Sequence, residues 1–121
     1  MVQTTNNKQY DLEDRTLKFA RSVRDFVNKL PKTAANFEYG KRLLRSSGSI
    51  GANYIEANES LSKKDFAMRV KICKKEAKES RYWLNLVDPG NGEELEKEQN
   101  SLFGEATESM KIFGSILEGS K

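Results

Sequence analysis

Hydrophobic residues recur every three or four positions along most of the 121-residue chain, which is the spacing that one face of an α-helix presents. The first such stretch has an apolar face that consists of Phe19, Val23, Phe26 and Leu30. Pro31 ends this helix, because the residue before a proline disfavours helical backbone. Asp11 or Asp14 is the predicted N-cap, so we expect residues 1–10 to form a flexible lead-in.

The second stretch is predicted to begin between Ala34 and Phe37. Its apolar stripe consists of Leu43, Ser47, Ile50, Tyr54, Ala57 and Leu61. Gly48 and Gly51 lie with Ile55 in a separate sector of this helix, and each glycine costs about 1 kcal/mol of helix propensity. We expect close packing of neighbouring helices against these positions to offset that cost.

The third stretch has the most regular pattern in the chain, alternating steps of four and three residues. Its seam consists of Phe66, Val70, Cys73, Ala77, Ser80, Leu84 and Val87. Ser62 is the predicted N-cap, in an approximate capping box with Asp65. The turn DPGNG at 88–92 ends the helix. A fourth helix is predicted from Glu93 to about Glu118, and its seam consists of Leu95, Leu102, Ala106, Met110, Phe113 and Leu117.

Four amphipathic helices with short connections predict an all-α fold, an antiparallel up-and-down four-helix bundle. Residues 11–121 are expected to form a single domain, since a chain of this length supports one core. No apolar run approaches the roughly 20 residues that a membrane-spanning helix needs. The first nine residues are polar and lack the apolar core of a signal peptide, so we expect a cytoplasmic protein without a membrane partner.

Residue composition argues against an enzyme and against a metal site. The chain has no histidine and a single cysteine, Cys73. These counts exclude an internal disulfide and remove the commonest general base and metal ligand. The glutamates of the second and third helices resemble half of a di-iron site, but the Glu-x-x-His pairs of such sites are missing. We therefore predict no catalytic residue, no metal and no cofactor.

Charge is unevenly spread, although the whole chain carries only +3. Residues 61–87 hold eight basic and three acidic side chains, a net charge of +5, whereas residues 88–121 hold three basic and eight acidic ones, a net charge of −5. The basic middle segment predicts an electrostatic partner. That partner is either nucleic acid or the acidic last segment of the same chain or of a neighbouring copy.

A row of cations on and beside the outer side of the third helix is the candidate nucleic-acid-binding site. It consists of Lys64, Lys71, Lys74, Lys75, Lys78 and Arg81. Cations about one helical turn apart can follow the phosphates of RNA or DNA, although lysine-rich faces are more often simply solvated. No aromatic stacking motif accompanies the row in the sequence, so stacking of single-stranded bases has little support and binding should be weakly sequence-specific.

A polar stripe is predicted beside the apolar stripe of the second helix, facing the third helix or a neighbouring subunit. Its residues are Arg45, Ser49, Asn53 and Glu56, together with Glu76 and Glu79 of the third helix. Arg45 could form a bidentate pair with one of the carboxylates. We favour structural roles, within or between subunits, over ligand binding. Catalysis is disfavoured, because the nearby serines have no histidine to act as a base.

Three apolar residues lie outside the predicted seams, namely Ile55, Met68 and Ile72. Apolar groups in such positions indicate a second buried face, as an oligomer requires. They are therefore the candidate oligomer interface.

The stretches LPKT, GKRLLRSSGSIGANYIEANES and SKKDFAMRVKICKKEAKESRYWLNLV resemble the 23S rRNA-intervening sequence protein family, also called S23. The resemblance extends from Asp11 to Val87 and, in pattern only, through the last helix. It implies a four-helix bundle that assembles into a homopentamer, a barrel with a central channel. Many members read SIPANIAEG where this chain reads SIGANYIEAN, so Gly51 predicts a straighter second helix than theirs.

A related branch, the accessory variability determinants of diversity-generating retroelements, is similar in fold and binds nucleic acid and a reverse transcriptase. A reverse transcriptase is thus an expected partner only if this chain belongs to that branch. We expect a non-enzymatic, self-assembling protein that binds structured RNA or DNA through its basic face. The alternative is a protein-interaction or assembly scaffold without nucleic-acid binding.

Overall fold

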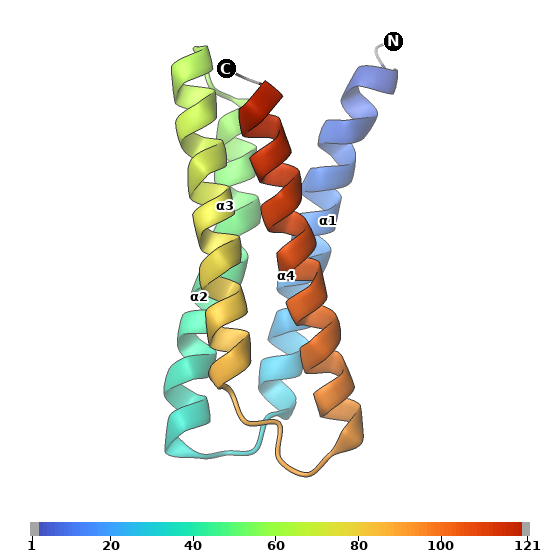
Figure 1. Ribbon diagram of the computed structural model, residues 1–121, viewed down its shortest axis with the longest axis vertical. Coiled ribbons are helices and arrows are strands. Elements are labelled where there is room, and N and C mark those ends of the chain that lie inside the picture. The colour runs from blue at the N-terminus through green and yellow to red at the C-terminus, as the bar shows by residue number, and fades with distance from the viewer. Residues whose placement is uncertain (1–2, 120–121) are drawn as a thin grey trace.

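Four long helices joined by three short connections make up the described backbone, residues 3–119, in a computed structural model of the chain. Side chains are described from residue 12 to residue 119. The helices are α1 (Gln3–Lys29), α2 (Ala34–Asn58), α3 (Lys63–Leu86) and α4 (Glu93–Gly119). They run alternately up and down, each packs on the next one in the chain, and α4 returns to α1 (Figure 1). The predicted up-and-down four-helix bundle is confirmed.

The helices begin at predicted positions except at α1. The backbone of α1 is helical from Gln3, so the N-cap predicted at Asp11 or Asp14 is wrong. Once a helix is nucleated, each added residue gains a hydrogen bond at little further cost, which allows α1 to continue into the polar stretch predicted as a lead-in. At α3 the predicted cap is confirmed, because Oγ of Ser62 accepts a 3.0 Å hydrogen bond from the N–H of Asp65.

The core lies between the four helices and contains most of the predicted seam residues. Its fully buried members from the four helices include Val23, Phe26, Leu43, Ile50, Val70, Cys73, Ala77, Leu84, Ala106 and Phe113. The exception is Leu61, which is 99% exposed. α2 ends at Asn58, so Leu61 lies in the connection to α3 rather than on the predicted stripe.

The glycine at position 51 allows α1 to approach α2 closely. A β-carbon on Gly51 would lie 2.8 Å from Oγ1 of Thr16, closer than such atoms come in proteins. Thr16 is itself buried, and its hydroxyl donates a 2.7 Å hydrogen bond to the carbonyl oxygen of Leu12. The close packing predicted at Gly51 is therefore confirmed, whereas a β-carbon on Gly48 would meet no atom within 4 Å.

One buried amide joins the two connections at the lower end of the bundle in Figure 1. The side chain of Asn36 accepts a 2.8 Å hydrogen bond from the N–H of Asp88 and donates a 2.9 Å bond to its carbonyl oxygen. It also donates to the carbonyl oxygen of Pro31 at 3.0 Å. These bonds tie the α1–α2 connection to the α3–α4 connection and fix the lower end of α3.

Candidate nucleic-acid interface

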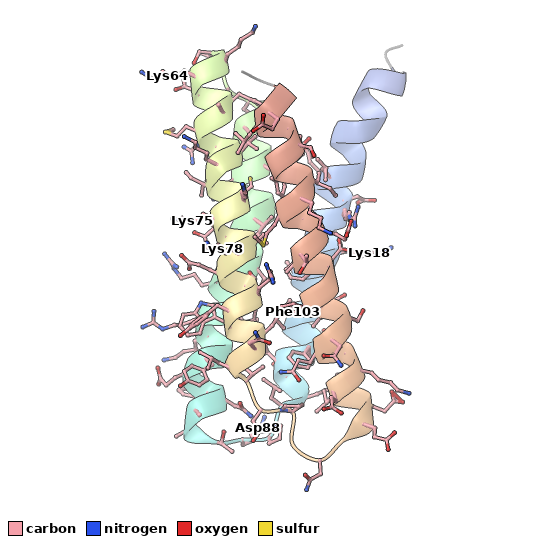
Figure 2. The ribbon with its side chains drawn as sticks, in the orientation of Figure 1. Lys18, Lys64, Lys75, Lys78, Asp88 and Phe103 are labelled. Atoms are coloured by element: carbon pink, nitrogen blue, oxygen red, sulfur yellow. The ribbon has the colours of Figure 1, made fainter. Side chains whose placement is uncertain are left out.

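The lysines predicted to bind nucleic acid follow the outer side of α3. We call the exposed group Lys64, Lys71, Lys75 and Lys78 the lysine row. Figure 2 shows three of its members placed one after another along the helix. Because an α-helix rises 1.5 Å per residue, the last three members are spaced by about 4.5 to 6 Å along its axis. The row is therefore a linear array of positive charges.

The two other predicted cations turn toward α4. Nη1 of Arg81 lies 3.2 Å from Sδ of Met110, and its guanidinium carbon lies 4.7 Å from the ring centroid of Phe103. Nε of Arg81 is buried and has no hydrogen-bond partner among the described residues. Lys74 is exposed, but its ammonium group lies over Gly114. Arg81 thus belongs to the α3–α4 contact rather than to the exposed row.

Two acidic side chains of α4 pair with cations of α1 rather than with the lysine row. Nε of Arg15 lies 2.6 Å from Oε2 of Glu105, and Nζ of Lys29 lies 2.6 Å from Oε2 of Glu98. The hydrogen bond to Glu105 raises the pKa of Arg15. In residues 12–119 no ion pair joins α3 to another helix. Glu98 and Glu105 are therefore paired with α1 and not with the row.

Part of the predicted polar stripe forms a hydrogen-bonded chain between α2 and α3. The amide nitrogen of Asn53 donates to both the carbonyl oxygen and the hydroxyl of Ser49, each at 2.9 Å. The amide oxygen of Asn53 accepts a 3.0 Å hydrogen bond from Nη1 of Arg69. Sequence reasoning missed Arg69, although its position seven residues before Glu76 places both on one side of α3.

The remaining stripe residues are not brought together. Glu76 is only 6% exposed, with one carboxylate oxygen 3.7 Å from Nζ of Lys75 and the other without a hydrogen-bond partner among the described residues. Glu79 is half-buried, while Arg45 and Glu56 are exposed. The pair predicted between Arg45 and a carboxylate does not form within the described part of the subunit.

The three predicted interface residues lie on two separate surfaces. Ile55, 50% exposed, lines a groove of about 640 Å³ between α1 and α2 together with Leu17 and Ala20. Met68 is also 50% exposed but lies on the outer side of α3, where Ile72 is half-buried. Both surfaces expose apolar side chains, and neither is covered by another described part of this chain.

An aromatic cluster that the sequence did not predict lies between α2 and α3. The rings of Tyr39 and Trp83 are stacked, with centroids 5.9 Å apart and planes 29° from parallel. Tyr82 meets the Trp83 ring at 76° with centroids 5.1 Å apart. The guanidinium carbon of Arg42 lies 5.4 Å from the Trp83 centroid. Antiparallel packing of α2 on α3 brings these four residues, which we call the aromatic cluster, together from positions about 40 apart in sequence.

We also searched the described residues for metal-binding groups, a reactive thiol and membrane-spanning helices. No group of three potential metal ligands occurs in the described part of the chain. Cys73 is completely buried, and burial raises the pKa of its thiol to about 12. None of the helices, over the residues described, contains an apolar stretch long enough to cross a bilayer.

Comparisons with known proteins agree with the fold. The sequence model of the 23S rRNA-intervening sequence protein family matches residues 8–115. A crystal structure of a protein with unknown function from the S23 ribosomal protein family of Bacteroides thetaiotaomicron is 33% identical to this chain, with a TM-score of 0.77. The match covers 92% of this chain and 98% of that one. A comparison with curated proteins finds no match.

Neither of these descriptions names an enzymatic activity, a ligand or an assembly. The family match continues beyond Val87 through most of α4, where the sequence resembled the family only in pattern. Together the match and the fold confirm the resemblance. The chain belongs to the 23S rRNA-intervening sequence protein family.

Proposed function

We propose that this protein is a non-enzymatic, self-assembling bundle that binds structured RNA or DNA through the lysine row of α3. The observation that carries the proposal is the exposure of four lysines in one line, of which only Lys75 has a described carboxylate within 4 Å of its ammonium group. Exposed cations in a row, most of them without a carboxylate partner, bind phosphates by releasing the counterions of the nucleic acid. The cytoplasmic location stays a prediction.

Self-association is supported by the two exposed apolar surfaces. A cyclic assembly with head-to-tail contacts needs two different surfaces on each subunit. The α1–α2 groove at Ile55 and the first part of the outer side of α3, at Met68, can fill those roles, while Lys75 and Lys78 lie about two to three turns farther along the helix. Five copies are expected from the family resemblance. A ring would also repeat the lysine row on every subunit, which raises both the local field and the avidity for a polyanion.

A second candidate function is an assembly scaffold that binds no nucleic acid. The exposure of Ile55 and Met68 favours it, because such apolar surfaces serve protein contacts whether or not the lysines bind phosphates. A reverse transcriptase as the protein partner remains a prediction that depends on the retroelement branch. Salt dependence separates the two functions, since apolar contacts respond little to salt and phosphate contacts respond strongly.

The first experiment measures binding of nuclease-treated protein to labelled structured RNA and to duplex DNA across a salt series. We expect binding at low salt that weakens steeply as salt rises. Replacing Lys71, Lys75 and Lys78 with Ala should weaken binding and flatten the log–log slope by about 2 to 3, at roughly 0.9 per lost duplex contact. A slope unchanged by the triple substitution would show that the row does not bind phosphates.

The matched control removes three exposed cations elsewhere, Lys18, Arg21 and Lys32. Figure 2 shows Lys18 on α1, on the opposite flank of the bundle from the labelled lysines of α3. Both triple variants lose three positive charges, so a difference in their affinity for nucleic acid shows that the location of the charges matters. Equal weakening by the two would indicate attraction by net charge without a defined site.

Self-association is tested by placing a charge on each apolar surface. Ile55→Lys or Ile72→Lys should give particles of smaller mass by light scattering while helical circular dichroism is retained. Leu61→Lys is the control, because Leu61 is an exposed apolar residue of the α2–α3 connection. Undiminished mass in both Ile variants would exclude these surfaces as subunit contacts.

A further inference from the structure

Tyr82 lies in line with the lysine row and is 60% exposed. It follows Lys78 by four residues and Lys75 by seven, so the three side chains share one side of α3. The line of positive charges therefore ends on an open aromatic ring.

One neighbouring ring restricts the orientation of Tyr82. Trp83 meets Tyr82 edge to face at 5.1 Å, and Trp83 is itself stacked on Tyr39 at 5.9 Å. Tyr39 and Trp83 are half-buried, whereas Tyr82 is exposed. A ring whose orientation is restricted by a neighbour loses less conformational entropy when a flat ligand stacks on it.

From this arrangement we propose that an unpaired nucleobase stacks on Tyr82 while Lys75 and Lys78 bind the adjoining phosphates. The lysine row would then select single-stranded segments, such as the loops of a structured RNA, over continuous duplex. This inference rests on the proposed nucleic-acid binding and names the form of nucleic acid that is bound.

The charges around Tyr82 are complementary to a phosphate chain on one side of the ring. Lys78 and Arg42 are exposed, and neither has an ion pair with a described residue. Glu79, half-buried and three residues before Tyr82, repels phosphate on its own side. The strand is therefore expected to run along the Lys78 side of Tyr82.

Stacking on Tyr82 would explain a preference for single strands over duplex, which attraction between charges alone does not produce. Bases in a duplex are already stacked on each other and present only their edges in the grooves. An unpaired base exposes its face, and aromatic platforms combined with a cationic groove are the usual means of binding single strands. Replacing one such platform by Ala weakens binding by about 5- to 150-fold.

The test compares four labelled probes of equal length, an oligo(U) RNA, an oligo(dT) DNA, an abasic strand and a duplex. Tyr82→Ala should weaken binding of the oligo(U) and oligo(dT) probes at least about fivefold and leave the abasic probe unchanged, whereas Tyr82→Phe should keep the affinity. Phe37→Ala is the control, because Phe37 is an exposed ring on α2 outside the aromatic cluster. Preference between oligo(U) and oligo(dT) identifies RNA or DNA as the better ligand.

Trp83 is the only tryptophan of the chain, so its fluorescence reports directly on the aromatic cluster. Binding of oligo(U) or oligo(dT) should change that fluorescence, and binding of the abasic strand should change it less. An equal change with the two kinds of strand would contradict stacking beside Trp83.

Different failures point to different conclusions. If the abasic strand binds as tightly as the strands with bases and Tyr82→Ala changes nothing, stacking is refuted, while a loss in the lysine triple variant would still support the proposed function. If no probe binds at low salt, both proposals fail. If Tyr82→Ala lowers the assembled mass and leaves strand affinity intact, Tyr82 is a subunit contact and the inference is overturned.

Discussion

The residues on the inner and outer sides of α3 recur with the same spacing in the sequence. Their side chains differ in size, polarity and burial. The inner side consists of Val70, Cys73, Ala77, Ser80 and Leu84, which are all completely buried. The outer side includes Lys71, Lys75, Lys78 and Tyr82, which are all exposed. The inner side of α3 therefore packs in the core, whereas its outer side does not contribute to the core.

Because the two sides differ in burial, substitutions on one side should mainly change stability and substitutions on the other should mainly change binding. Burial of apolar side chains on the inner side stabilises the fold by roughly 25 cal/mol for each Å² removed from water. Substitutions of exposed side chains usually change stability by less than about 0.5 kcal/mol. Changes on the outer side should therefore alter what the protein binds without unfolding it, which makes the two sides experimentally separable.

The largest expected effect is that of Leu84→Ala on the inner side. Removing a fully buried leucine side chain leaves a cavity and lowers the free energy of unfolding by about 2 to 5 kcal/mol. Tyr82→Ala, only two residues away on the outer side, should lower it by less than about 1 kcal/mol. Urea unfolding followed by circular dichroism measures both, and similar losses would contradict the assignment of the two sides.

A smaller effect is expected from the hydroxyl pair on the inner side. The oxygens of Ser46 and Ser80 lie 2.9 Å apart, and both residues are completely buried. Ser80→Ala should lower the free energy of unfolding by about 1 kcal/mol, because the bond is lost although Ser46 still donates to the carbonyl oxygen of Leu43 at 3.3 Å.

A double-mutant cycle with Ser46→Ala isolates the pair itself. The double variant should lose less than the sum of the two single losses, by about 0.5 kcal/mol or more. Ser22→Ala, at an exposed serine of α1, supplies the solvent-exposed control. Strict additivity of the two inner substitutions would show that the hydroxyls do not stabilise each other.

Most of the fold could be predicted because the inner sides follow a simple period. Steps of three and four residues located the α3 seam from Val70 to Leu84, and Ser62 marked its start. The beginning of α1 could not be predicted in this way. Its polar first turns carry no apolar face, so only the continuation of an existing helix makes them helical.

The candidate site could be predicted only in part, because its components come from two helices. The lysine row is visible in sequence as a run of cations with helical spacing on α3. The aromatic cluster is not visible, since Tyr39 and Arg42 reach Trp83 only through the antiparallel register of α2 and α3. Arg81 has the same charge and helix as the row, yet it packs against Phe103 of α4. The periodicity of the sequence predicts on which side of a helix a residue lies. It does not predict contacts between residues of different helices, because these depend on how the helices pack.

The last prediction concerns the chemical reactivity of Cys73, whose thiol is the most reactive side-chain group on the inner side of α3. We expect this reactivity to be very low in the folded protein near neutral pH. The Cys73 thiol is completely buried and donates a 3.4 Å hydrogen bond to the carbonyl oxygen of Ile50. Burial raises its pKa from 9.0 to about 12, so the thiolate that reacts with disulfide reagents is scarce at pH 8. The native protein should therefore react slowly with such a reagent at pH 8, and rapidly once it is unfolded in guanidinium.

The same shift predicts how stability depends on pH. Between pH 9 and pH 12 the folded protein keeps a proton at Cys73 that the unfolded chain loses, so the contribution of the raised pKa to stability is complete below pH 9 and declines as the pH rises. The wild type should thus lose more stability than Cys73→Ala over this range. Tyr54, whose pKa burial also raises, titrates in both proteins and largely cancels in that comparison. Parallel losses in the two proteins, or rapid labelling of the native thiol at pH 8, would mean that the inner side of α3 opens to water far more often than its complete burial indicates.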